Sequence, residues 1–211
     1  MNIAHDEKIL VVKRAILFGK EPLQGFYPIT DFNEYQNIIT QHKEFLWRST
    51  METDPLYKQI IPYLIFAYQD KYFVMLRKHN ASETRLSSKY SLGIGGHIRQ
   101  EDMADSSLLS WARREFEEEV SYQGSLSVCP LGMINDDSNA VGQVHAGFVF
   151  LLHGDNASIA IKDEHKEGKL LSCEQLQPLY GQMERWSQLV FDFLVTHPGL
   201  VKNNKEKRSL V

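Results

Sequence analysis

The stretch GIGGHIRQEDMADSSLLSWARREFEEEV, residues 93–120, decides which fold this sequence predicts. It opens with three glycines in four positions, and its last six residues include four glutamates. Glycine lets the backbone adopt positive φ angles and approach a ligand closely. A glycine-rich turn that leads into an acidic helix therefore brings backbone carbonyls and carboxylates to one place.

Residues 105–120 are predicted to form a helix, because apolar side chains recur there at spacings of three and four. The glutamates Glu115, Glu118 and Glu119 share an adjacent face at the same spacings, so their Cβ atoms are expected roughly 5–6 Å apart. The side of this helix that faces the core is formed by Leu109, Ala112, Phe116 and Val120.

Placing three glutamates on one face at the end of a helix is energetically unfavourable by itself. Like charges repel at this spacing, and the negative end of the helix dipole adds roughly 0.3–1 kcal/mol for each exposed acid. A divalent cation reverses the sign of this interaction, and three carboxylates are hard oxygen ligands suited to Mg²⁺ or Mn²⁺. A solvated acidic face is the alternative for such a run. The glycine turn before it favours a site for metal-bound phosphate.

This pattern resembles the Nudix box, G-x5-E-x7-R-E-U-x-E-E-x-G-U, in which U is an aliphatic residue. Gly96 matches the first glycine, and Phe116 stands at the first U position. The resemblance covers residues 57–200 and implies an α+β fold, a Nudix-like α/β/α sandwich with a mixed β-sheet and an N-terminal extension. The R-E-x-x-E-E core is matched by Arg114, Glu115, Glu118 and Glu119.

Three features depart from the family pattern. The loop between Gly96 and Arg114 is four residues longer than the family spacing. By strict count the first glutamate of the box falls at Asp102, with Glu101 beside it, and the sequence leaves open which of them takes its place. Ser121 replaces the glycine after the acids. The GGHI turn and the lengthened loop are similar to those of a Nudix subset described as phosphoesterases.

The resemblance implies a metal-dependent pyrophosphohydrolase that cleaves a diphosphate bond in a nucleoside diphosphate-linked or related substrate. Its catalytic residues would be Glu115, Glu118 and Arg114, with Arg114 paired to Glu115. Mg²⁺ or Mn²⁺ would be held by Glu115, Glu118, Glu119 and the carbonyl of Gly96. The alternative is a non-catalytic Nudix domain that binds a nucleotide or another ligand, which the altered glutamate and glycine of the box suggest.

Weaker candidates for contacts with the substrate lie outside the acidic helix. For each of them, a structural or solvent-exposed role is the alternative. The candidates are Arg85 and Lys89 before the glycine turn, His97 after it, His145 in a predicted strand, and Glu164 and Glu167 in a later charged loop.

A third hypothesis is an isomerase of the isoprenoid diphosphate kind, which shares the Nudix fold. That chemistry needs a cysteine acid in the cavity. The two cysteines, Cys129 and Cys173, are both outside the box, so this hypothesis ranks last. The two cysteines also lack the spacing of metal ligands. We therefore expect them to be free thiols in a reducing compartment.

The whole chain fits an enzyme that acts on a small molecule. It has 211 residues and a net charge of -4, whereas a general nucleic-acid binder is normally basic. It shows neither a secretory signal pattern nor a run of ~18 apolar residues that would span a membrane. We therefore expect a cytoplasmic protein with a small-molecule diphosphate substrate, and neither a nucleic acid polymer nor a membrane as partner.

Three regions are predicted along the chain: an N-terminal extension packed on the main domain (1–56), a Nudix-like domain (57–200) and a polar tail (201–211). A strand or a strand pair is predicted at 9–18, strands at 125–135 and 142–154, and a hairpin at 57–79. Helices are predicted at 31–48, 173–180 and 182–196, and a charged loop at 161–169. The sequence leaves open whether ILVVKRAILF, residues 9–18, supplies an extra strand or a homodimer contact.

Overall fold

The computed structural model describes residues 6–19, 24–29, 31–77, 89–102, 107–162 and 166–202. The chain divides into two units, each built from segments that are distant in sequence. Unit 1 consists of Met1–Tyr63, Gly95–Glu115 and Pro130–Val149. Unit 2 consists of Leu64–Ile94, Phe116–Cys129 and Phe150–Val211.

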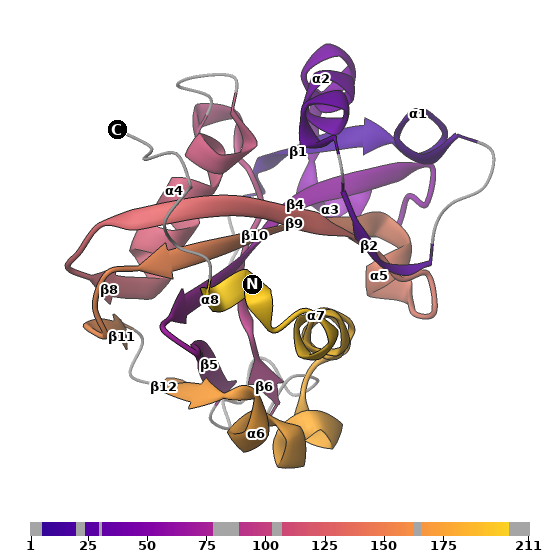
Figure 1. Ribbon diagram of the computed structural model, residues 1–211. Coiled ribbons are helices and arrows are strands. Elements are labelled where there is room, and N and C mark those ends of the chain that lie inside the picture. Colours follow the sequence, from indigo (N-terminus) through magenta and orange to yellow (C-terminus); the bar gives the residue numbers. More distant parts are fainter. Residues whose placement is uncertain are drawn as a thin grey trace, which may run out of the picture. The chain divides into compact units, whose positions relative to one another are not determined.

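Helices and strands are intermixed along the chain (Figure 1). The first part contains β1 (Lys8–Lys13), α1 (Arg14–Phe18), β2 (Gly25–Pro28), α2 (Phe32–His42), β3 (Glu44–Trp47) and α3 (Arg48–Met51). The middle contains β4 (Tyr57–Tyr68), β5 (Lys71–Arg77), β6 (Tyr90–Ser91), β7 (Gly93–Gly95), the 3-10 helix η1 (Gln100–Asp102), α4 (Leu108–Glu119) and β8 (Val120–Tyr122). The last part contains β9 (Leu126–Asn135), α5 (Ala140–Val144), β10 (His145–Gly154), β11 (Ile159–Ile161), β12 (Lys166–Ser172), α6 (Cys173–Leu176), η2 (Gln177–Gln182), α7 (Arg185–Thr196) and α8 (Gly199–Lys202).

Among the described residues, ten strands form one sheet, and β8 pairs with β11 in a second, small sheet. The main order of the large sheet is β12-β5-β4-β10-β9-β2, and β1, β3, β6 and β7 pair beside this path. The strands β4, β9 and β10 are long enough to contribute residues to both units. The α+β class with a large mixed sheet, predicted from the sequence, is confirmed. No described helix combines the length and the apolar character that a membrane crossing requires.

In unit 1 the N-terminal segment contributes strands and core side chains. β1 pairs antiparallel with β3 and with β4, and β2 pairs antiparallel with β9. Ile9 of β1 packs with Met51 of α3 in a buried cluster. Phe32 and Tyr35 of α2 contact the ring of Phe148 in β10 edge-on, with ring-centre distances of 6.5 and 6.2 Å. The N-terminal segment therefore supplies an extra strand, one of the two alternatives that the sequence left open.

In unit 2, β5 pairs antiparallel with β4, β6 and β12. The β4–β5 hairpin turns at Gln69, whose φ of 54° lies in the left-handed region, and this confirms the hairpin predicted at 57–79. Phe66 of β4 makes edge contacts with Phe73 of β5 and Tyr122 of β8. The helix α7 adds the buried residues Ser187, Val190, Phe191 and Leu194.

Four predicted elements are wrong in detail. Residues 14–18 form helix α1 rather than strand, because the pairing of β1 with β4 ends at Lys13, followed only by the bond from the Arg14 amide to the Leu56 carbonyl. The helix predicted over 31–48 ends at His42, and β3 follows because it pairs with β1. The strand predicted at 142–154 is preceded by α5 and begins only at residue 145. The charged segment 161–169 contains the start of β12, because backbone pairing with β5 defines this strand whatever its side chains.

Candidate active site

The glycine turn and the acidic helix meet in unit 1 at Gly96 and Glu115. β7 leads directly into Gly96, and α4 carries Glu115. A Cβ atom added at Gly96 would lie 2.2 Å from the carboxyl carbon and from one carboxylate oxygen of Glu115. Any residue other than glycine would therefore have to displace this carboxylate. The backbone of the turn and the first acid of the motif are in direct contact.

Arg114 ties Glu115 to the turn. Its Nη2 atom forms an ion pair with the Glu115 carboxylate at 2.8 Å, which is the pair that the resemblance implies. The same Nη2 donates to the backbone carbonyl of His97 at 3.0 Å. Nε and Nη2 also donate to the two carboxylate oxygens of Asp102, at 2.7 and 3.0 Å. One guanidinium thus holds the helix, the turn and the loop that follows the turn.

Asp102, and not Glu101, takes the place beside the arginine that the sequence left open. The Asp102 side chain is only 6% exposed, and besides Arg114 it accepts a hydrogen bond from the Arg99 amide at 2.7 Å. Glu101 lies beside it in η1 with its side chain exposed. The 3-10 turn takes up part of the lengthened loop and directs Asp102 toward Arg114. A shorter acid therefore makes the bidentate contact that fixes the arginine.

The second half of α4 belongs to unit 2 and carries Glu118, which is exposed, and Glu119, which is half-buried. Lys162 caps the end of this helix: its amide donates to the Glu119 carbonyl at 3.0 Å, and its Nζ donates to the Glu117 carbonyl. These bonds satisfy terminal carbonyls, and the lysine charge complements the negative end of the helix dipole. The helix therefore ends without the glycine that Ser121 replaces.

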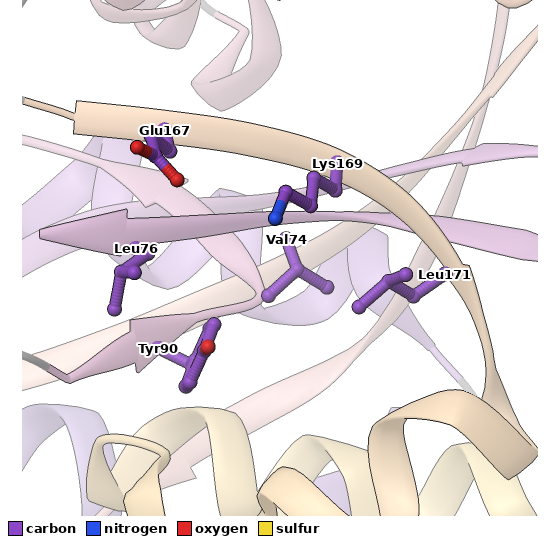
Figure 2. Close-up of a pocket in the computed structure, with 6 residues that line it drawn as sticks. All are labelled: Val74, Leu76, Tyr90, Glu167, Lys169 and Leu171. Carbon is purple, nitrogen blue, oxygen red and sulfur yellow. The ribbon is translucent and has the colours of Figure 1, made fainter.

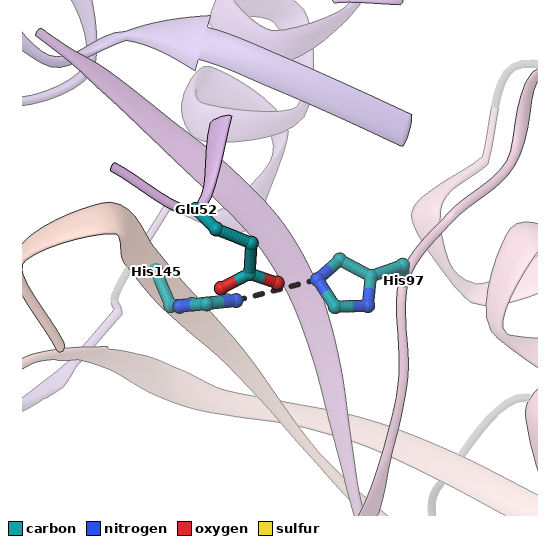
Figure 3. A group of neighbouring side chains, drawn as sticks. All are labelled: Glu52, His97 and His145. Carbon is teal, nitrogen blue, oxygen red and sulfur yellow. Dashed lines mark hydrogen bonds between the residues drawn. The ribbon is translucent and has the colours of Figure 1, made fainter. Parts of the chain in front are cut away.

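A second group of polar side chains in unit 1 consists of Glu52, His97 and His145 (Figure 3). Glu52 follows α3, His97 follows Gly96, and His145 begins β10. One donor atom from each residue lies within 4.8 Å of the other two. The Nε2 atoms of the two histidines are 3.3 Å apart. No sequence motif marks Glu52, because only the folded N-terminal segment brings it to the histidines.

Neighbouring groups fix how the two imidazoles are oriented. Nδ1 of His145 lies 2.7 Å from the Val141 carbonyl, which can only accept, so Nδ1 carries a proton and Nε2 of the neutral ring has a lone pair. Gln59 is fully buried, and its amide nitrogen donates to the Met51 carbonyl at 3.1 Å. The Gln59 oxygen therefore faces His97, whose Nε2 lies 2.7 Å away.

Burial keeps both rings neutral. It lowers the pKa of His97 to about 3, and the positive charges of Arg48, Arg99 and Arg114 act in the same direction. Burial also lowers the pKa of His145, against a smaller opposing effect of the Val141 hydrogen bond. At neutral pH the cluster therefore offers uncharged imidazole nitrogens beside a carboxylate.

The remaining candidates for substrate contacts lie in unit 2 or outside the described residues. Lys89 is half-buried and directly precedes β6 in unit 2. Glu167 lies in β12 with its side chain exposed, at the rim of a small pocket formed with Lys169, Tyr90 and neighbouring apolar residues (Figure 2). That pocket offers about 20 Å³, room for roughly one water molecule. Arg85 and Glu164 lie outside the described residues.

The chain has similar proteins along nearly its full length, although no family model matches it. It is 35% identical over 204 residues to Protein YmaB of Bacillus subtilis (strain 168), a match that covers 90% of this chain and 98% of YmaB. It is 33% identical to Tm1382, a candidate Nudix hydrolase of known crystal structure. That match has a TM-score of 0.76 and covers 90% of this chain and all of Tm1382.

A more distant structure shares the fold alone. The Nudix domain of Shewanella oneidensis NrtR, solved with ADP ribose, is 11% identical with a TM-score of 0.51, and the match covers 66% of this chain and 88% of that one. In this chain the motif glycine touches the motif helix at Glu115, and Arg114 is fixed by Asp102. With the full-length likeness to Tm1382, this shows that the chain belongs to the Nudix hydrolase family and is a Nudix-type pyrophosphohydrolase.

Proposed function

We propose that this protein is a metal-dependent hydrolase that cleaves the diphosphate bond of a nucleoside diphosphate-linked or related small molecule. The observation that carries the proposal is the contact between Gly96 and the Glu115 carboxylate, which leaves no room for a Cβ atom in the turn. It unites a bare backbone segment, which a phosphate or a cation can approach, with the first acid of a helix. Glu118 and Glu119 follow on that helix at the spacing that places them on the same face.

The donor set fits a hard divalent cation. Glu115, Glu118 and Glu119 would hold Mg²⁺ or Mn²⁺ together with the backbone carbonyl of Gly96, since both ions prefer oxygen ligands. Such an ion supplies neutralisation of phosphate charge and activation of water.

The side chains around Glu115 would position it for proton transfer. Arg114 orients the Glu115 carboxylate through a charge-assisted contact at 2.8 Å. Asp102 in turn fixes Arg114 through Nε and through the same Nη2 that pairs with Glu115. Glu115 or Glu118 would accept the proton of the attacking water as general base.

The first substrates to test are nucleoside diphosphate derivatives. The Nudix domain of NrtR, which shares the fold, was solved with ADP ribose, so ADP-ribose is one sensible starting compound. Lys89 and His97 are candidates for contacts with the phosphates, as is Arg85 outside the described residues. Glu167 is a candidate for a further acid at the site, as is Glu164 outside the described residues.

The alternative is a ligand-binding Nudix domain without turnover. Its motivation is the altered box, in which Asp102 stands for glutamate and Ser121 for glycine. In this chain Asp102 binds Arg114, and Lys162 binds the carbonyl of Glu119 at the end of the helix, so the fold accommodates both changes. This alternative predicts a nucleotide-induced rise in melting temperature with no product in any metal.

The test is product release from nucleoside diphosphate sugars, dinucleoside polyphosphates, NADH, ADP-ribose and nucleoside triphosphates, each with Mg²⁺, Mn²⁺ or EDTA. We expect turnover of at least one class that needs the metal. Turnover that persists in EDTA would contradict the proposal. Ligand-induced stabilisation without turnover on any compound would favour the binding domain.

A further inference from the structure

We propose that Glu52, His97 and His145 form a second metal site, which takes a transition-metal ion of the Zn²⁺ type and is separate in its ligands from the carboxylate site of the box. This inference does not rest on the proposed hydrolysis. Among the described residues, these three are the group of histidine and acidic side chains whose donor atoms converge within 4.8 Å. Figure 3 shows the carboxylate of Glu52 beside the facing nitrogens of the two rings.

The distance between the two histidines suits a shared ion. Two nitrogens that each bind zinc at ~2.0–2.1 Å in tetrahedral geometry lie about 3.3–3.4 Å apart. The Nε2 atoms of His97 and His145 are 3.3 Å apart. The separation of the two ring nitrogens therefore suits two ligands of one ion, and the Glu52 carboxylate lies within 4.8 Å of both as the third.

His145 has the hydrogen-bond partner that a metal-binding histidine usually has. A metal-binding histidine almost always donates its second ring N–H to a carbonyl or carboxylate, which fixes the tautomer and the ring orientation. His145 makes this bond to the Val141 carbonyl at 2.7 Å. Its Nε2 atom faces His97 at 3.3 Å, and the ring is buried. This histidine is ready to bind an ion without rearrangement.

His97 needs one change, a shift of its proton between ring nitrogens. In the metal-free protein its Nε2 donates to the Gln59 oxygen at 2.7 Å. Binding moves this proton to Nδ1 or releases it, and Nε2 becomes a ligand. Gln59 stays in place through its bond to the Met51 carbonyl, so its oxygen remains directed at the site as a further oxygen donor.

Glu52 supplies the negative charge of the site and lies on its solvent-exposed side. It is exposed, whereas His97 is half-buried and His145 is buried. Its carboxylate binds Nε of Arg48 at 3.2 Å, so the ion must compete with this arginine. Arg48 has a second acidic partner, Glu7, at 3.0 Å and stays paired when Glu52 turns to a metal.

The ligand chemistry separates the two sites. Imidazole nitrogen suits Zn²⁺ and related transition metals, whereas Mg²⁺ prefers oxygen and retains much of its hydration. We therefore expect the cluster to bind Zn²⁺ tightly even in excess Mg²⁺.

The experiment uses the full chain freed of metal and titrates it with Zn²⁺ by calorimetry in excess Mg²⁺. The variants are Glu52→Gln, which changes an exposed residue, and His97→Asn. The matched controls are Glu34→Gln and His42→Asn, which change exposed residues of α2, and Glu118→Gln, which changes the box. Melting curves establish that each variant is folded before its binding is compared.

We expect one zinc per chain, and an affinity at least about 100-fold lower in Glu52→Gln and His97→Asn, because loss of a support group alone costs 10–100-fold. The three controls should bind like the wild type. Zinc-edge X-ray absorption should show two imidazole ligands in the wild type and one in His97→Asn. Absence of zinc binding, binding that survives both cluster variants, or binding lost in Glu118→Gln would each overturn the proposal.

Discussion

At the scale of single residues, the site depends on how Arg114 and Gly96 hold one carboxylate. Arg114 reaches Glu115, the His97 carbonyl and Asp102 with a single guanidinium. Gly96 makes room for the carboxylate from the other side. Both residues were predicted from the motif. The pairing of Arg114 with Glu115 was predicted too, but its second acidic partner was not, because Asp102 and Glu101 are equivalent acids until the turn of η1 directs one inward.

Replacing Gly96 by alanine should separate activity from stability. The new Cβ atom would meet the far end of the Glu115 side chain, which can move without disturbing the backbone. We expect the free energy of unfolding to change by less than about 1 kcal/mol, whereas a catalytic group displaced by about 1 Å can cost on the order of 100-fold in rate. Steady-state kinetics and urea unfolding measure both. The control is Gly181→Ala, where the Cβ atom meets nothing within 4 Å. Unchanged activity in Gly96→Ala would show that the position of Glu115 is unimportant.

Asp102→Asn should damage the protein more than Glu101→Gln. Asparagine keeps the shape of the side chain but loses the charge, so the contacts to Nε and Nη2 of Arg114 weaken. We expect a loss of about 1–3 kcal/mol in the free energy of unfolding, with lower kcat. Glu101 is exposed, and its variant should stay within about 0.5 kcal/mol of the wild type. Equal free energies of unfolding for the two variants would contradict the role of Asp102 in holding Arg114.

At the scale of the element, α4 combines a buried stripe with the acidic face. The helix and its acids were predicted, but the set of buried residues is partly different from the predicted set. Leu108 and Trp111 are fully buried, whereas the predicted Leu109 is only half-buried. Ala112 and Phe116 are buried as predicted. Spacing alone could not choose between neighbouring stripes, because residues 108 and 109 are both leucine and only packing distinguishes them.

Trp111 should be the residue of α4 on which stability depends most. It is 1% exposed, and truncation of a buried aromatic side chain leaves a large cavity. We expect Trp111→Ala to lower the free energy of unfolding by about 3–5 kcal/mol, measured by urea unfolding. Ser110→Ala changes an exposed neighbour on the same helix and should be neutral or slightly stabilising. A cost below about 1 kcal/mol for Trp111→Ala would contradict the burial of this side chain.

At the scale of the whole molecule, the sequence predicted the α+β class, the β4–β5 hairpin and the motif helix, whose patterns are local. It did not predict how the N-terminal segment joins the fold. That depends on Asp137, which binds Arg14 after β1, Lys58 in β4 and Gln24 before β2. These residues lie far apart in sequence and share no motif. Glu52 reaches the histidines in the same way, through long-range packing.

Asp137→Asn should destabilise unit 1 in a pH-dependent manner. Burial raises the pKa of Asp137, but its hydrogen bonds with Arg14, Lys58 and Gln24 outweigh this and hold the pKa well below its usual range. The folded pKa is thus lower than the unfolded value of about 3.9, so the stabilisation is present above that pH and is lost as the pH falls below it. Lys58 is fully buried and would lose its charged partner in the variant.

We expect Asp137→Asn to cost at least about 2 kcal/mol at pH 7, and the difference from the wild type should shrink toward pH 3. Urea unfolding across this pH range measures it. Asp31→Asn is the matched control, because asparagine caps the start of α2 as well as aspartate does. A difference that stays constant with pH would show that the charge of Asp137 is not what stabilises the fold.

If the acids of α4 hold a catalytic metal, then substitutions of the neighbouring residues Glu118 and Glu117 should affect activity differently. They are neighbours, both exposed and equally charged, but only Glu118 shares the face of Glu115 and Glu119. The measurement is kcat on the best diphosphate substrate in Mg²⁺ for the wild type, Glu118→Gln and Glu117→Gln. We expect a loss on the order of 100-fold or more in Glu118→Gln and nearly full activity in Glu117→Gln. Equal activity of the two variants would contradict a catalytic metal at these acids.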